Sequence, residues 1–177
     1  MRKEYRKAVR ELFTRGMASR LPQFEPTKVK APILFSGESV FRWEASTTLH
    51  CFVLLVPDSR GYQSFTVELA WSHEARFPDV SSKPTLLLGP GDPNPVDVSE
   101  GIVRLGGILS RKDIWWELPD PALKRPGDLA ALQESIEPVS TSVARERAAG
   151  PVEACLIALQ EGGVDFFRSL AGRDGLS

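Results

Sequence analysis

Cysteine and histidine are scarce in this chain, which has two of each among 177 residues. A secreted scaffold that depends on disulfides would show a far higher density of cysteine. Cys51 and Cys155 each lie in an apolar stretch, so we expect two reduced thiols in a reducing compartment. The close ligand spacings that are typical of zinc sites are absent as well, and no metal is predicted.

Long apolar runs are also missing. The longest covers residues 51–56, far short of the ~20 residues that a membrane-spanning helix needs. The first residues, MRKEYRKAVRELF, are positively charged, but neither an apolar run nor a small-residue cleavage site follows them. The sequence therefore predicts no signal peptide and no membrane contact, and we expect the protein in the cytoplasm.

The motifs of common enzymes are absent. There is no GxSxG, SxxK or HExxH pattern and no glycine signature for a dinucleotide or a P-loop. The one glycine-rich loop, residues 89–95, contains three prolines that remove backbone donors and an aspartate that repels phosphate. We predict a rigid exposed turn there and no cofactor.

The overall composition is that of an ordinary globular protein. Hydrophobic residues make up 42% and charged residues 25%, with a net charge of −1. These proportions exclude a disordered, collagen-like or coiled-coil chain. A chain of this length can bury about 70% of its unfolded surface. We therefore predict a single globular domain over residues 1–177.

Hydrophobic spacing predicts a helix followed by an antiparallel sheet. Residues 2–17 show apolar side chains at helical spacing, and Gly16 is expected to cap or fray the end. Residues 21–32 contain three prolines, which predicts an irregular connection. The period then changes to two, and strands are predicted over residues 39–45, 49–56, 65–71, 85–88 and 101–105, the second and third joined by a hairpin.

Helical signals return in the last third of the chain. Asp128 is a good N-cap for a helix over residues 128–135, and Pro151 suits the first position of another helix. Gly162 and Gly163 are expected to interrupt that helix before a last apolar turn. One helix, an antiparallel meander of about five strands and two or three C-terminal helices together predict the α+β class.

Few side chains qualify as catalytic. His50 and Cys51 are neighbours on one strand, so their side chains should point to opposite faces and cannot form a dyad. A Cys51 thiolate served by the distant His73 stays open, but burial is the commoner role for such a cysteine. Glu68 alternates away from the apolar face of its strand and is predicted to face solvent. No catalytic residue is assigned.

Charge is distributed unevenly along the chain. Residues 1–30 hold nine Lys+Arg and three Asp+Glu, a balance of +6, so residues 31–177 carry −7. A basic face on such a helix is usually solvated, and the alternatives are docking on an acidic partner or contacts with phosphates. A pI near 6.2 and the lack of a known motif argue against a nucleic-acid partner. The basic face of the first helix consists of Lys3, Arg6, Lys7 and Arg10.

An acidic patch follows the middle of the chain. It is formed by Asp92, Asp97 and Glu100, with no basic residue among them, and carries a charge of −3. Such a patch could steer a cationic partner towards the protein, whereas the alternative is simple solvation.

Two adjacent tryptophans mark the segment after the last predicted strand. Trp115 and Trp116 should face opposite sides of an extended chain, so that one enters the core while the other covers an edge or forms a contact surface. Asp113 lies just before them and could pair with Arg104 across a turn. We take Asp113, Trp115 and Trp116 as candidate partner-binding residues, together with the acidic patch.

Several short motifs follow one another along the chain in a characteristic order. They are residues 65–69, residues 104–106, Leu109, Asp113, Trp115 and Trp116. With the first helix before them and the terminal helices after them, this order resembles the uncharacterised bacterial family named domain of unknown function 4304. The resemblance covers most of the chain, although its specific motifs are short. The family has no established reaction, so the resemblance implies no catalytic residues.

We therefore predict a non-catalytic bacterial protein-binding module, of the immunity type that neutralises a toxin by covering its active surface. The expected partner is a basic toxin domain that the acidic patch attracts. Two alternatives stay open. One is a small enzyme that uses His73, Cys51 or the acidic loop, and the other is a nucleic-acid-associated protein that uses the basic face of the first helix.

Overall fold

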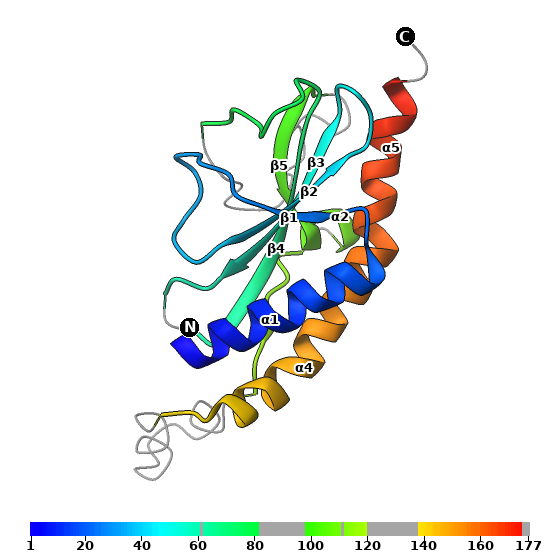
Figure 1. Cartoon of the computed structure of the whole chain (residues 1–177). Helices are drawn as coiled ribbons and strands as arrows, with labels where there is room; N and C mark the ends of the chain where they lie inside the picture. The colour runs from blue at the N-terminus through cyan, green and yellow to red at the C-terminus, as the bar shows by residue number, and fades with distance from the viewer. Residues whose placement is uncertain (61, 82–97, 111, 120–137, 175–177) are drawn as a thin grey trace.

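An antiparallel sheet with helices on one of its faces makes up the computed structural model, which describes residues 1–60, 62–81, 98–110, 112–119 and 138–174 (Figure 1). This arrangement confirms the predicted α+β class. None of the described helices is both long and apolar enough to span a lipid bilayer. The helices are α1 (Lys3–Arg20), α2 (Leu105–Ser110), α4 (Thr141–Ala158), the π-helical turn η3 (Leu159–Gly163) and α5 (Val164–Asp174).

The sheet has the order β1-β2-β3-β4-β5, and β6 pairs with β4 next to β5. Every neighbouring pair is antiparallel, and the predicted hairpin is confirmed as β3–β4, with Val53 opposite Leu69. The segment predicted to be irregular contains the short edge strand β1, where a proline is tolerated. The predicted strand over residues 85–88 and helix over residues 128–135 lie outside the described residues. The strands are β1 (Glu25–Thr27), β2 (Ser39–Glu44), β3 (His50–Pro57), β4 (Ser64–Ser72), β5 (Glu100–Arg104) and β6 (Trp116–Glu117).

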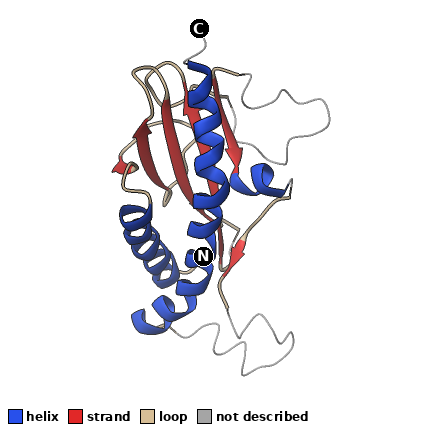
Figure 2. Cartoon of the chain, turned by 90° about the vertical axis from the view of Figure 1, so that its right-hand side faces the viewer, coloured by secondary structure: helices blue, strands red, loops and turns tan. Residues whose placement is uncertain are grey.

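The main core lies between the helices and one face of the sheet. Figure 1 shows α1 and α4 side by side, and Figure 2 shows α5 running along the strands. These helices bury their apolar stripes against alternate residues of the sheet, such as Phe65 and Trp71. On α1 the stripe agrees with the predicted one, and its buried residues are Tyr5, Ala8, Val9, Phe13 and Met17.

The C-terminal helices follow one another without leaving helical structure. Ser140 caps α4 by accepting a hydrogen bond from a backbone N–H of the first turn, 3.3 Å long. The prediction that Pro151 begins a helix is wrong, because it lies inside α4, where the preceding Gly150 lacks the Cβ that would crowd the proline ring. The predicted interruption at Gly162 and Gly163 takes the form of η3, a π-helical turn that separates α4 from α5.

Gly16 of α1 lies against Leu156 of α4. The sequence predicts the end of the first helix here, whereas α1 continues to Arg20. A Cβ atom at Gly16 would collide with the side chain of Leu156 in α4. Glycine is therefore needed at this position for packing, and it does not mark the end of the helix.

The variant Gly16→Val should lower the free energy of unfolding by about 1–3 kcal/mol, because buried Leu156 would have to move. Urea denaturation measures the change. The matched control is Gly172→Val on α5, where a Cβ meets no atom within 4 Å, and it should change the same free energy by less than about 0.5 kcal/mol. Equal losses at the two positions would contradict this packing of α1 on α4.

The second face of the sheet is buried as well. All nine residues of β4 are buried, so the prediction that Glu68 faces solvent is wrong, and its exposed fraction is 2%. Irregular segments supply the cover, because Leu34 and Phe77 pack on the apolar residues of this face. Thr66 Oγ1 also donates a hydrogen bond of 2.8 Å to the Ile114 carbonyl. The alternation of apolar and polar residues within β4 cannot predict this burial, because the segments that cover the second face are distant in the sequence.

His50 is buried on this second face. Its ring centre lies 6.4 Å from that of Phe52, and 8% of the residue is exposed. Burial, together with the positive charge of Arg42, lowers the pKa of His50. The native protein therefore resists protonation at this imidazole.

The variant His50→Gln should reduce the pH dependence of stability. As the pH falls below about 6.5, the unfolded chain binds a proton at this imidazole before the native chain does, because the native pKa is lower. The free energy of unfolding of the natural chain should therefore fall between about pH 7 and about pH 5, and that of the variant should fall less. Urea denaturation at both pH values measures this, and identical slopes for the two proteins would rule out the linkage.

Candidate functional site

A cleft of about 750 Å³ opens on the second face of the sheet, beside the turn that joins β3 to β4. Segments that are far apart in the sequence meet there, since α1, the residues before β2, the sheet and the segment after α2 all contribute. The charged and aromatic residues that line the cleft are Arg6, Phe35, Glu38, Asp58, Arg60, Glu68, Arg104, Asp113 and Trp115.

Glu68 of β4 and Arg104 of β5 form the buried part of the cleft. They are register partners in the antiparallel pair, so their side chains share one face. Glu68 Oε1 lies 4.0 Å from Arg104 Nε, and the two side chains are 2% and 17% exposed. The guanidinium thus places a positive charge beside a carboxylate that has little contact with water.

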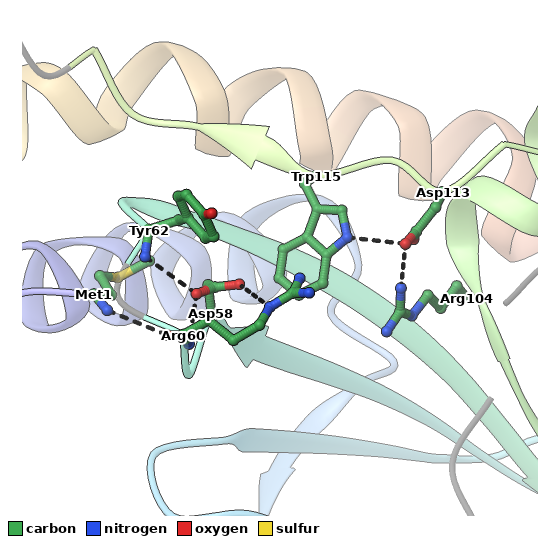
Figure 3. Close-up of polar contacts among 7 residues, drawn as sticks. All are labelled: Met1, Asp58, Arg60, Tyr62, Arg104, Asp113 and Trp115. Atoms are coloured by element: carbon green, nitrogen blue, oxygen red, sulfur yellow. Dashed lines mark hydrogen bonds and ion pairs between the residues drawn. The ribbon is translucent and has the colours of Figure 1, made fainter. Parts of the chain in front are cut away.

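Asp113 and Trp115 are held against Arg104. The Asp113 Oδ2 atom accepts hydrogen bonds from Arg104 Nη1 and from Trp115 Nε1, the second 3.0 Å long (Figure 3). This confirms the predicted contact between Arg104 and Asp113. The guanidinium carbon of Arg104 lies over the Trp115 ring at 5.2 Å from its centre, and that of Arg60 at 5.8 Å. The half-buried indole is therefore fixed through its N–H and through its π system.

The short helix α2, which the sequence did not predict, brings this segment back to the cleft. Gly106 allows the return, because a Cβ there would lie only 2.7 Å from the Ile114 nitrogen. β6 then pairs Trp116 with Phe65, and the two rings stack 5.8 Å apart on the helix side. Trp115 lines the cleft on the other side, so the two tryptophans face opposite sides, as predicted.

Asp58 shapes the turn between β3 and β4. Its buried carboxylate accepts backbone hydrogen bonds from Arg60 (2.7 Å) and Tyr62 (3.2 Å), and it lies 3.6 Å from Arg60 Nε (Figure 3). The amino group of Met1 donates to the Asp58 carbonyl at 3.2 Å. Asp58 therefore holds Arg60 and Tyr62 in place, and Arg60 and the 60% exposed Tyr62 lie at the surface beside the cleft.

Charges of both signs line the cleft. Asp58 and Glu68 are each 2% exposed, and Asp113 is bonded to Arg104. Arg6 and Arg60, in contrast, are exposed. A ligand that approaches the rim therefore meets two guanidinium groups before it meets the buried carboxylates.

Glu100, the residue of the predicted acidic patch that the structure describes, lies at the other end of β5 from Asp113 and Trp115. Asp92 and Asp97 lie outside the described residues. Glu100 begins β5, whereas Asp113 is bonded to the residue that ends this strand. The Glu100 carboxylate accepts hydrogen bonds from Arg76 Nη2 (2.6 Å) and from the Asp79 backbone (2.7 Å), so its charge is already balanced within the chain.

The predicted basic face of α1 is divided in the structure. Arg6 lines the cleft and Arg10 lines a neighbouring hollow. Lys7 Nζ lies 3.9 Å from Glu11, whose carboxylate also binds a side chain of α4. Lys3 is exposed and lines neither hollow. Arg6 and Arg10 therefore belong to the hollowed side of the molecule, and Lys7 to the side of the helices.

The candidate nucleophiles lie away from the cleft. Cys51 and Cys155 have no exposed surface and belong to the helix-side core, and burial raises the pKa of the Cys155 thiol. His50 is on the opposite face from Cys51, as predicted, and His73 does not line the cleft. Within the described ranges, no three or more His, Cys, Asp or Glu side chains are grouped so that they could hold a metal ion.

The sequence does not predict several residues of the cleft and its surroundings. Phe35 and Arg60 in the cleft and Tyr62 beside it lie in segments that carry no motif, and the alternation of β4 predicts that Glu68 faces solvent. Phe35 is 66% exposed. An exposed aromatic residue has no signature in a single sequence, because its exposure depends on where distant segments pack.

Comparison of the chain with models of protein families, with curated proteins and with solved structures finds no match.

Both thiols should resist alkylation in the folded protein, because no solute reaches sulfur atoms without exposed surface. A chromogenic disulfide reagent at mildly alkaline pH should react with neither cysteine in native protein and with two thiols per chain in denaturant. Rapid reaction of one thiol in the native protein would contradict this and would favour the alternative of thiol chemistry.

Proposed function

We propose that this chain is a non-catalytic protein-binding module whose cleft around Trp115 receives a segment of the partner. One observation carries the proposal: the indole of Trp115 is half-buried in the cleft and is held in place by Asp113, Arg104 and Arg60. A side chain that is ordered before binding loses little conformational freedom when the partner arrives. Such an indole is suited to anchor an interface.

The surroundings of Trp115 support a protein partner. Tyr62 and Phe35 are 60% and 66% exposed, and Arg60 lies beside the indole. Trp, Tyr and Arg are the residue types that contribute most to the affinity of protein interfaces. The cleft, with its volume of about 750 Å³, also offers a recess for side chains of the partner.

In its finer form, the proposal is a bacterial immunity-type protein that neutralises a toxin in the cytoplasm. This form rests on the resemblance to the family named domain of unknown function 4304, which stays a prediction, and on analogy with small α+β proteins of this type. The surface expected to act is now the cleft around Trp115, because Glu100 of the acidic patch is engaged by Arg76.

A photo-crosslinking amino acid in place of Tyr62 should capture one protein in the native host. The same amino acid in place of Ile157, which is 40% exposed on α4, should not capture it. The purified partner should then bind the variant Trp115→Ala at least about thirtyfold more weakly, as expected when an interface anchor worth about 2 kcal/mol is lost. Titration calorimetry measures the affinity.

A second variant separates anchoring from folding. Trp115→Phe keeps an aromatic ring but loses the N–H that bonds Asp113, so it should weaken binding less than Trp115→Ala. Urea denaturation checks that both variants are folded. Unchanged affinity of both variants for the captured protein, or equal capture from positions 62 and 157, would overturn the proposed function.

A further inference from the structure

A second hollow adjoins the cleft around Trp115. It has a volume of about 610 Å³ and lies between α1 and the residues that join β1 to β2. The two hollows have Phe35, Ser36 and Glu38 in common, so we treat them as one groove. The groove begins at Trp115, passes the exposed ring of Phe35 and ends beside β1.

Positive side chains line this groove and pair with no carboxylate of the described residues. The residues concerned are all exposed. In the part of the chain that the structure describes, no ion pair joins any of them to an acidic side chain. Two come from α1 and two from the loop after β1, so they lie along one groove although they are separated in sequence. They are Arg6, Arg10, Lys28 and Lys30.

The acidic residues of the groove do not cancel this charge at the surface. Asp58 and Glu68 are buried, and Asp113 is bonded to Arg104. Glu38, which is half-buried, is the carboxylate that both hollows share. The groove is therefore most positive beside β1, where Arg10, Lys28 and Lys30 lie, and of mixed charge at the Trp115 end, where Arg6 and Arg60 lie near carboxylates.

We propose that the segment bound in this groove is an acidic peptide in an extended conformation, with an aromatic or apolar residue beside Phe35 and carboxylates on either side of it. The inference rests on the proposed function, and it names the chemistry of the partner. Complementary charge steers association and selects among partners. The sequence predicts a basic partner for the acidic patch, whereas this groove selects an acidic segment.

A single-stranded nucleic acid fits the same groove less well. Such a strand carries a phosphate at every nucleotide, and some of these would lie beside Glu38 and Asp113. A peptide can place a neutral residue at Glu38 and keep its carboxylates on either side of it, near Arg6 in one hollow and near Arg10 in the other. The alternation of charge along the groove therefore favours a peptide.

Fluorescence anisotropy of the full chain with a labelled peptide tests this proposal. The probe carries glutamates on both sides of one central phenylalanine, and the control peptide has lysine in place of each glutamate. We expect saturable binding of the acidic peptide that weakens as ionic strength rises to the physiological range. The control peptide should bind at least about tenfold more weakly.

A pair of double variants locates the binding surface. Lys28→Glu with Lys30→Glu should weaken binding of the acidic peptide at least about tenfold. Arg145→Glu with Arg168→Glu makes the same change of charge at exposed arginines of α4 and α5, and it should alter the affinity by less than about twofold. Urea denaturation checks that both double variants are folded.

Two outcomes would overturn the inference that the bound segment is acidic. They are absence of peptide binding and equal losses of peptide affinity in the two double variants. Tighter binding of a labelled oligothymidine strand would overturn it in favour of a nucleic acid.

Failure of this inference can be told apart from failure of the proposed function. Photo-crosslinking from Tyr62 does not depend on the sign of the partner's charge. If the affinity of the captured protein depends on Trp115 but not on Lys28 and Lys30, the inference of an acidic segment is overturned and the proposed function stands. No capture from Tyr62 would overturn the proposed function, whatever the peptide does.

Discussion

The burial of the Glu68 carboxylate beside Arg104 is the constraint on which the second face of the sheet depends. A buried carboxylate is costly unless a positive group or hydrogen-bond donors accompany it. Arg104, opposite Glu68 in the β4–β5 register, supplies that charge. The same guanidinium binds Asp113 and lies over Trp115. One ion pair in the sheet thus determines where a separate segment of the chain lies, and the gain is a defined arrangement more than stability.

The two faces of the sheet have different tasks. Among the described residues, the helix side holds most of the buried apolar side chains and both cysteines, and this burial contributes most to the stability of the fold. The second face has a smaller apolar cluster around Phe52, and polar residues occupy the rest. Because irregular segments cover this face, their side chains can form a cleft that packed helices would fill. The candidate site lies where the apolar packing ends.

The sequence predicts best what depends on neighbours in the chain. Helical spacing on α1, the β3–β4 hairpin and the opposite orientation of Trp115 and Trp116 all follow from local periodicity. The burial of Glu68 does not, because it depends on segments such as those of Leu34 and Ile114, which are far away in the sequence. Two helix boundaries predicted from proline and glycine are wrong for a related reason. Pro151 and Gly16 act through their packing within and between helices, whereas the local rules treat them as helix boundaries.

The uneven charge of the chain acquires a physical meaning only in the fold. The balance of +6 in residues 1–30 suggests a basic helix face, yet Lys7 lies beside Glu11, away from the hollows. The chain instead turns back after α1, so that Lys28 and Lys30 lie along the same groove as Arg10. At physiological ionic strength charges act over about 8 Å. Charges grouped within one groove therefore act together on a bound segment, while the net charge of −1 for the whole chain has little influence there.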